Sequence, residues 1–295
     1  MHIDMHMHMP YAYGSTYTGA VGVLLPLVTR TRDHAADLRK AKVSSGLVEL
    51  DELLRESIRA LAKLAELKAN QRPVVESDVI HQIIRMLGAE SADEGAVSIG
   101  VKQECLELLG HLADVPQCLQ MLVSDGALHS LIALLHLQGT PVETPAAELL
   151  AKLAQVKEYQ AQISPVETIP LLSDLLHSAS QPAALAALHA LNELLFDNAP
   201  SQMLALRAGV VEPCIKLARS DQTSLSSNAA TLLCQIILAD TSTDTRGKGH
   251  PKAGGAKVGA GGAPQPLSLE TRLQMLSSMA MSKPVSQSVS QYVRK

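Results

Sequence analysis

The chain has 295 residues, of which 46 % are hydrophobic and only 2 % aromatic, so it can bury a sizeable core built mainly from aliphatic side chains. Its net charge of −4 is unevenly spread, because residues 46–240 carry 12 Lys and Arg against 24 Asp and Glu, while both flanking segments are basic. An acidic middle argues against nucleic-acid binding and favours basic partners, or contact with the chain's own basic ends.

The cysteines and the hydropathy pattern bear on the compartment. Cys105, Cys118, Cys214 and Cys234 have no paired spacing and are predicted to be buried reduced thiols, which is typical of a cytoplasmic protein, with the nucleus as the alternative. No stretch approaches 18 apolar residues, so we expect no transmembrane segment. The short apolar run at residues 20–28 lacks a preceding basic segment and makes a poor signal peptide.

Residues 1–45 are predicted to be a disordered or atypical N-terminal segment. Residues 1–19 are rich in Met, His and Tyr, and we expect them to be disordered or to reflect where the chain was started. The rest is ambiguous, with a short helix expected from Asp33 to Val43. The histidines of this segment have no carboxylate framework beyond Asp4, so no metal site is predicted there.

Residues 46–240 repeat at a fixed period. A first amphipathic helix covers residues 47–67, and anchors of the form Leu-x-x-Leu/Ile recur at spacings of 48, 41, 41 and 42 residues. They begin at Leu61, Leu109, Leu150, Leu191 and Leu233. A period in the low forties indicates stacked helical units that cannot bury their apolar faces alone.

Each regular unit divides into a short helix, a turn, a second helix, a break and a long third helix. Gly126 and Gly209 stand at the first turn, where a left-handed backbone favours glycine. Pro170 and Pro213 are predicted to lie in the opening turn of the second helix. In the 48-residue unit, residues 88–100 lengthen the loop before the third helix, which we interpret as a tolerated surface insertion.

The second and third helices resemble those of armadillo repeats. The stretches GALHSLIALL, ETIPLLSDLL and GVVEPCIKLA are similar to the pattern G-x-I-P-x-L-V-x-L-L, and AELLAKLA and ALHALNELL are similar to its third helix. The resemblance covers about residues 47–239, and three helices per unit fit armadillo better than two-helix HEAT repeats. The predicted fold is an all-α, armadillo-like right-handed helical solenoid of about four to five repeats.

The resemblance implies a binding groove on the concave face, lined by third-helix residues. Importin-like members clamp an extended basic peptide there with ladders of Trp and Asn. Alignment places Arg59, Glu107, Glu148, His189 and Thr231 in the Trp-like row, and Lys63, His111, Lys152, Glu193 and Gln235 in the Asn-like row. Neither row holds a Trp or an Asn, which argues against recognition of nuclear-localisation peptides in the importin manner.

The mixed charge of the predicted groove residues leaves the class of ligand undecided. The basic ladder that catenin-like members use for acidic ligands is only partly suggested, by Lys63 and Lys152. The two rows together mix acidic, basic and neutral side chains.

The chain after residue 240 changes composition. Residues 241–266 hold seven Gly and predict a flexible linker, and residues 283–295 predict a polar tail. Between them, residues 267–282 predict a short amphipathic helix whose apolar stripe is Leu269, Leu273, Leu276 and Met279. This helix either caps the last repeat or docks on a partner.

No catalytic, cofactor-binding or metal motif appears in the sequence. We therefore expect a non-enzymatic protein–protein interaction scaffold or adaptor that binds a peptide or protein along the groove and uses no cofactor. The alternative is a regulatory or substrate-recruiting subunit of an enzyme complex, such as a ubiquitin ligase or a phosphatase. Nucleic acid is disfavoured as a partner, and the pattern leaves the oligomeric state undecided.

Overall fold

The computed structural model describes residues 12–41, 46–88, 97–163 and 165–243, and in these residues every regular element is a helix. It divides into two compact units, Met1–Leu149 and Leu150–Lys295, with the boundary inside α8 (Glu143–Ala154). The predicted linker beyond Thr243, the amphipathic helix at 267–282 and the tail at 283–295 lie outside the described residues, as do residues 1–11.

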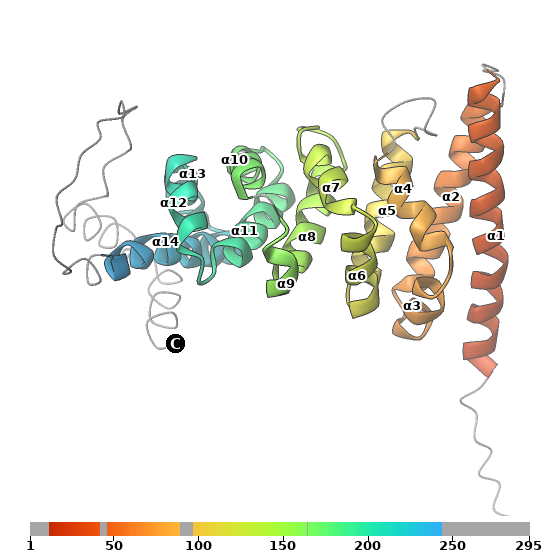
Figure 1. The fold of residues 1–295 in the computed structure, drawn as a ribbon, viewed down its shortest axis with the longest axis horizontal. Helices are drawn as coiled ribbons and strands as arrows, with labels where there is room; N and C mark the ends of the chain where they lie inside the picture. Colours follow the sequence, from red (N-terminus) through yellow and green to blue (C-terminus); the bar gives the residue numbers. More distant parts are fainter. Residues whose placement is uncertain (1–11, 42–45, 89–96, 164, 244–295) are drawn as a thin grey trace, which may run out of the picture. The chain divides into compact units, whose positions relative to one another are not determined.

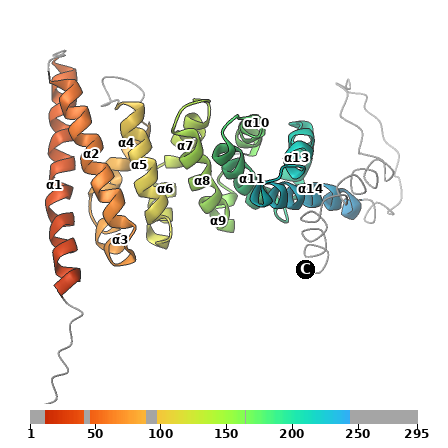
Figure 2. The same cartoon turned by 180° about the vertical axis from the view of Figure 1, so that it is seen from behind.

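The first unit begins with two long helices that lie side by side, α1 (Ala12–Lys40) and α2 (Leu47–Ala65) (Figures 1 and 2). Helix α1 is much longer than the short helix expected from Asp33 to Val43, and it includes the end of the stretch expected to be disordered. Val21, Val28 and Ala35 recur at steps of seven and are buried, so the apolar run at residues 20–28 contributes Val21 and Val28 to the buried face of a helix.

Two three-helix repeats follow in the first unit. They are α3 (Lys68–Val75), α4 (Val79–Gly88) and α5 (Ile99–Leu112), then α6 (Pro116–Ser124), α7 (Ala127–Leu135) and α8. Helix α2 occupies the place of a third helix before the first complete repeat. It packs on α5, and α4 packs on α7, so equivalent helices of successive repeats contact each other. The insertion falls between α4 and α5, as predicted, with residues 89–96 outside the described part.

The second unit holds the end of α8 and two further repeats. They are α9 (Lys157–Gln160), α10 (Pro165–Leu175) and α11 (Gln181–Leu195), then α12 (Ala199–Arg207), α13 (Val211–Ala218) and α14 (Thr223–Thr243). Helix α11 packs on α14, and α10, α12 and α13 cover the backs of these two third helices. Every large aliphatic side chain on the inner face of α11, including Leu188, Leu191 and Leu195, is fully buried.

Two local predictions have different outcomes. Gly126 and Gly209 have φ of 76° and 77°, which confirms the left-handed turn before the second helix. Pro213 lies in the opening turn of α13, as predicted, but Pro170 lies inside α10. Helix α10 begins earlier, at Pro165, because Pro suits a first helical position, where its missing N–H has no intrahelical partner.

Candidate protein-binding surface

The ten predicted groove residues occupy equivalent places on the third helices. Each of α2, α5, α8, α11 and α14 contributes two of them at a spacing of four residues, which puts both on one side of the helix. Four are exposed, namely Lys63, Glu107, Glu148 and His189. Five are half-buried, namely Arg59, His111, Lys152, Glu193 and Thr231, and Gln235 is buried.

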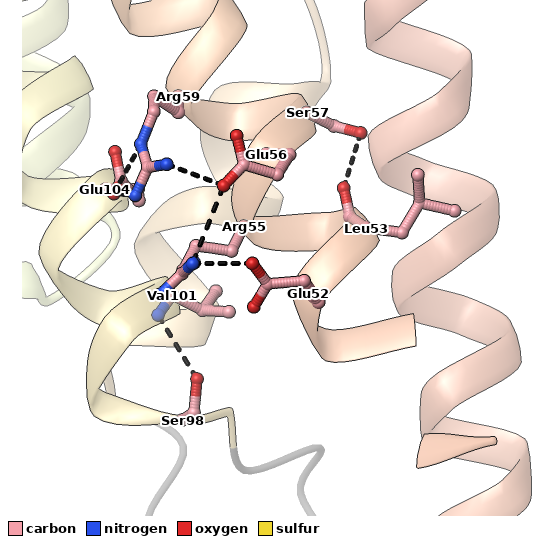
Figure 3. Close-up of polar contacts among 9 residues, drawn as sticks. All are labelled: Glu52, Leu53, Arg55, Glu56, Ser57, Arg59, Ser98, Val101 and Glu104. Carbon is pink, nitrogen blue, oxygen red and sulfur yellow. Dashed lines mark hydrogen bonds and ion pairs between the residues drawn. The ribbon is translucent and has the colours of Figure 1, made fainter. Parts of the chain in front are cut away.

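In the first unit, an ion pair joins the first two third helices. The Nη2 and Nε atoms of Arg59 on α2 donate to Oε1 of Glu104 on α5 at 2.6 and 3.0 Å (Figure 3). Nη1 of the same guanidinium donates to Oε1 of Glu56 at 2.6 Å. The hydrogen bonds to Glu104 raise the pKa of Arg59 above its usual value. This pairing fixes the register of α5 against α2.

The remaining charges of these two helices lie close to this pair. Lys63 donates to Glu66 at 2.8 Å, which raises the pKa of Lys63 and lowers that of Glu66. The negative charge of Glu107 also raises the pKa of both Arg59 and Lys63, and His111 lowers that of Glu66. The structure therefore brings the first two predicted pairs, Arg59 with Lys63 and Glu107 with His111, onto one surface.

The corresponding side of the second unit is polar and includes the charged residues Lys152 and Glu193. Asn192 on α11 donates from Nδ2 to the backbone oxygen of Asn228 on α14 at 3.1 Å, and so holds these third helices together. Gln160 on α9 donates to the backbone oxygen of Glu193 at 2.5 Å. His189 stands exposed on α11, and Thr231 donates to the backbone of its own helix.

Gln235 is the one predicted groove residue that is buried. It is only 3 % exposed, and among the described residues no hydrogen-bond partner is found for its Oε1. It therefore offers no surface to a ligand in this structure, although the repeat period places it level with half-buried Glu193. Leu232, Leu233, Cys234, Ile236 and Ile237 around it are also buried, so no side of this turn is open.

Sequence reasoning missed the residues that tie the surface together. Glu104 lies among the apolar residues Val101, Cys105 and Leu108 of α5, and only its burial shows that it needs a partner. A glutamate interrupting an apolar stripe is a signal that could have found it, because buried carboxylates are rare unless they are paired. The second oxygen of Glu104 is buried, and no hydrogen-bond partner is found for it among the described residues.

The described residues also bear on the other predictions. All four cysteines are buried, and none of them forms a disulfide; burial raises the pKa of Cys214 to about 12 and that of Cys234 to about 11. The described part of the chain has no group of three or more His, Cys, Asp or Glu side chains that could hold a metal ion. No single described helix is long and apolar enough to cross a membrane; only α6 and α7 taken together, bent by 85°, pass that test.

Comparison with solved structures identifies the fold. A designed armadillo repeat protein superimposes with a TM-score of 0.59 at 18 % identity, over 81 % of this chain and 91 % of that one. A second designed armadillo repeat protein, solved in complex with the peptide (KR)4, gives a TM-score of 0.61 at 16 % identity, over 88 % and 98 % of the two chains. The chain has an armadillo-like repeat fold. An engineered protein gives a TM-score of 0.61 at 20 % identity, over 87 % and 94 %.

Sequence comparison adds one curated relative. U-box domain-containing protein 24 of Oryza sativa subsp. japonica is 27 % identical over 225 residues, which cover 73 % of this chain and 27 % of that protein. The chain therefore spans about a quarter of the length of this relative. No protein-family model matches the chain.

Proposed function

We propose that this protein is a non-enzymatic interaction scaffold or adaptor that binds a peptide or protein partner through the polar side of its third helices, the side predicted to line a concave groove. One observation carries the proposal. On an armadillo-like fold, the third helices α2, α5, α8 and α11 each keep an exposed or half-buried polar pair at the same place, although α5, α8 and α11 are otherwise largely buried. An apolar helix needs no such pairs for its own packing.

The similar solved structures support a peptide as the ligand. One designed armadillo repeat protein was solved in complex with (KR)4, and another was designed for modular peptide recognition. Both share only the fold with this chain, at 16 % and 15 % identity. Without the Trp and Asn ladders, this chain would use other side chains for the same task.

The charges of the first unit favour a basic ligand. Arg55, Arg59 and Lys63 on α2 each already pair with a carboxylate of α2, α5 or the residue after α2. An acidic ligand would therefore have to displace a glutamate from each of them. Among the described residues, no ion pair is found for the exposed Glu107 and Glu148, so a cationic side chain can approach them without breaking a pair.

A labelled (KR)4 peptide is a suitable probe, with a (GS)4 peptide for comparison. We expect the probe to bind, and the double variant Glu107→Lys/Glu148→Lys to weaken binding about tenfold, since each exposed pair contributes up to about 1 kcal/mol. The matched control is Glu167→Lys/Asp174→Lys, which changes the net charge equally on exposed positions of α10. An equal loss in the control would show that only the net charge attracts the peptide.

The second candidate function is a regulatory or substrate-recruiting subunit of an enzyme complex, such as a ubiquitin ligase or a phosphatase. The similarity to a U-box domain-containing protein favours keeping this candidate. Affinity capture with mass spectrometry separates the two candidates. Recovery of a catalytic subunit that is retained by Glu107→Lys/Glu148→Lys, while other partners are lost, would favour the regulatory subunit. Loss of all partners with this variant supports the scaffold.

A further inference from the structure

Phe196 is an aromatic side chain that the second unit leaves open to solvent. It is the single Phe of a chain that has five Tyr and no Trp, and it is 52 % exposed at the end of α11. Scattered exposed apolar residues are common on protein surfaces and need no explanation by themselves. The surroundings of this ring set it apart, because it lies at the end of the polar side of α11.

Phe196 continues a row of side chains on one side of α11. It is the C-cap residue and has a φ of −62°, so the helical path still sets where its side chain begins. It comes seven residues after exposed His189 and three after half-buried Glu193, and both spacings return to the same side of an α-helix. At 1.5 Å per residue, the row from His189 to Phe196 is about 10 Å long. The ring therefore extends the part of α11 that was predicted to bind a ligand.

The other repeats do not use an aromatic side chain at this position. The equivalent residues, five after the first Leu of each anchor, are Glu66, Asp114 and Gln155, and all three are polar. Asp197 follows the ring with a φ of 51°, a left-handed backbone that Asp adopts more readily than most residues. The chain therefore turns directly after Phe196, and the next helix, α12, begins at Ala199.

Two carboxylates flank the ring in the chain. Glu193 lies about one helical turn before it, and exposed Asp197 follows it directly. In the described part of the chain, no ion pair is found for either carboxylate. Gln160 of α9 donates to the backbone oxygen of Glu193 at 2.5 Å, which ties α9 to this end of α11 without using the carboxylate. An open aromatic face beside negative charge suits a cation that can stack and form an ion pair at once.

We propose that Phe196 and Glu193 form a subsite for an arginine side chain of a basic ligand. The guanidinium stacks on the ring of Phe196 and donates to the carboxylate of Glu193, while Asp197 adds negative charge. Arginine suits this site better than lysine, because its planar group can stack and donate hydrogen bonds together, whereas an ammonium is a compact and strongly hydrated charge. The inference rests on the proposed function, since it names the ligand side chain that the second unit selects.

A single Trp placed at the subsite reports on it directly, because the chain has no Trp. Phe196→Trp keeps an aromatic face for stacking, and the full-length variant is titrated with the peptides (RG)4 and (KG)4, which carry equal charge. We expect (RG)4 to change the emission along a saturating curve, and (KG)4 to need at least about threefold higher concentration for the same change. Equal responses to the two peptides overturn the preference for arginine.

The matched control is Val166→Trp on α10. Val166 is 69 % exposed, belongs to the same unit and stands beside Glu167, so it also places a Trp next to a carboxylate. Its emission should stay unchanged at peptide concentrations that saturate Phe196→Trp. An equal response from the control overturns the subsite, because any exposed Trp of this acidic chain would then report the peptide.

The affinity of labelled (RG)4 supplies a second test without Trp. Phe196→Leu keeps an apolar side chain but removes the ring, and Glu193→Gln keeps the size of the side chain but removes its charge. Each should weaken (RG)4 binding about threefold. In Phe196→Leu the preference for (RG)4 over (KG)4 should also shrink, which a general loss of affinity would not produce.

The outcomes separate this inference from the proposed function. The scaffold proposal stands and the subsite is wrong if Glu107→Lys/Glu148→Lys weakens (RG)4 while Phe196→Leu and Glu193→Gln leave its affinity unchanged. If neither peptide binds the full chain, both the basic ligand and the subsite are wrong.

Discussion

Substitution of Leu191 by Ala probes whether α11 is oriented as described. Leu191 is 0 % exposed, and α11 is packed by α10, α12 and α14, so its side chain has neighbours on several elements. Shortening Leu191 to Ala removes buried methyl and methylene groups from the core. The lost burial costs about 2 kcal/mol at ~0.8 kcal/mol per group. A cavity that the neighbours cannot close adds to this, up to a total of about 5 kcal/mol.

We expect the upper part of that range, about 3–5 kcal/mol, because three surrounding helices restrict collapse of the site. For a unit of about 150 residues this lowers the melting temperature by about 10 °C. In a repeat array the loss should concentrate in α11 and the helices that contact it, since each repeat depends mainly on its neighbours.

The measurement is urea unfolding followed by circular dichroism, with hydrogen exchange to locate the loss. His189→Ala is the matched control, because His189 is exposed on the same helix two residues away. The control should change stability by less than about 0.5 kcal/mol. A similarly small change in Leu191→Ala would refute the orientation of α11, and with it the assignment of its polar side as the binding surface.

Three further predictions follow from single features. Gly126→Ala should lower the free energy of unfolding by about 1–2 kcal/mol in chemical unfolding, because Gly126 has φ of 76°. Gly110→Ala inside α5 has room for a Cβ and should instead raise it by about 0.5–1 kcal/mol. Arg59→Met should lower the melting temperature more than Glu104→Met, since the first leaves a buried carboxylate unpaired; the reverse order would contradict this account of the pair. Cys214 in the native protein should resist alkylation at pH 8 and react after unfolding, because burial raises its pKa to about 12; rapid labelling of the folded chain would show that α13 opens.

The repeat period was enough to predict the fold, but it could not predict which side chains meet. Apolar residues at helical spacing located each third helix, because that spacing reflects burial against neighbouring helices. The pairing of Arg59 with Glu104 depends on how α2 and α5 are rotated against each other, which residues 45 positions apart in the chain do not encode locally. Helix α1 was underestimated because Pro26 and the glycines beside it disfavour a helix, and packing on α2 outweighs that preference.

The burial of Gln235, which the repeat period places on the predicted surface, also could not be predicted from the pattern. The repeat period assigns each third-helix residue an equivalent position in the other repeats. Using it to predict exposure assumes that every repeat has the same surroundings. In α14 all the residues from 232 to 237 are buried. The position equivalent to Glu193 is therefore not on an open surface in this helix.

The exposed carboxylates of the first unit lead to a last prediction, on salt. If a cationic peptide binds the first unit through the exposed carboxylates Glu107 and Glu148, its affinity should fall as ionic strength rises, since exposed pairs are screened beyond about 8 Å at 0.15 M salt. Glu107→Gln/Glu148→Gln should weaken binding at low salt and flatten this dependence. His189→Ala changes a side chain of the second unit, keeps both carboxylates of the first, and should leave the slope unchanged, whatever it does to affinity. A slope that the Gln variants do not alter would assign the attraction to the net charge of −12 over residues 46–240, rather than to these two side chains.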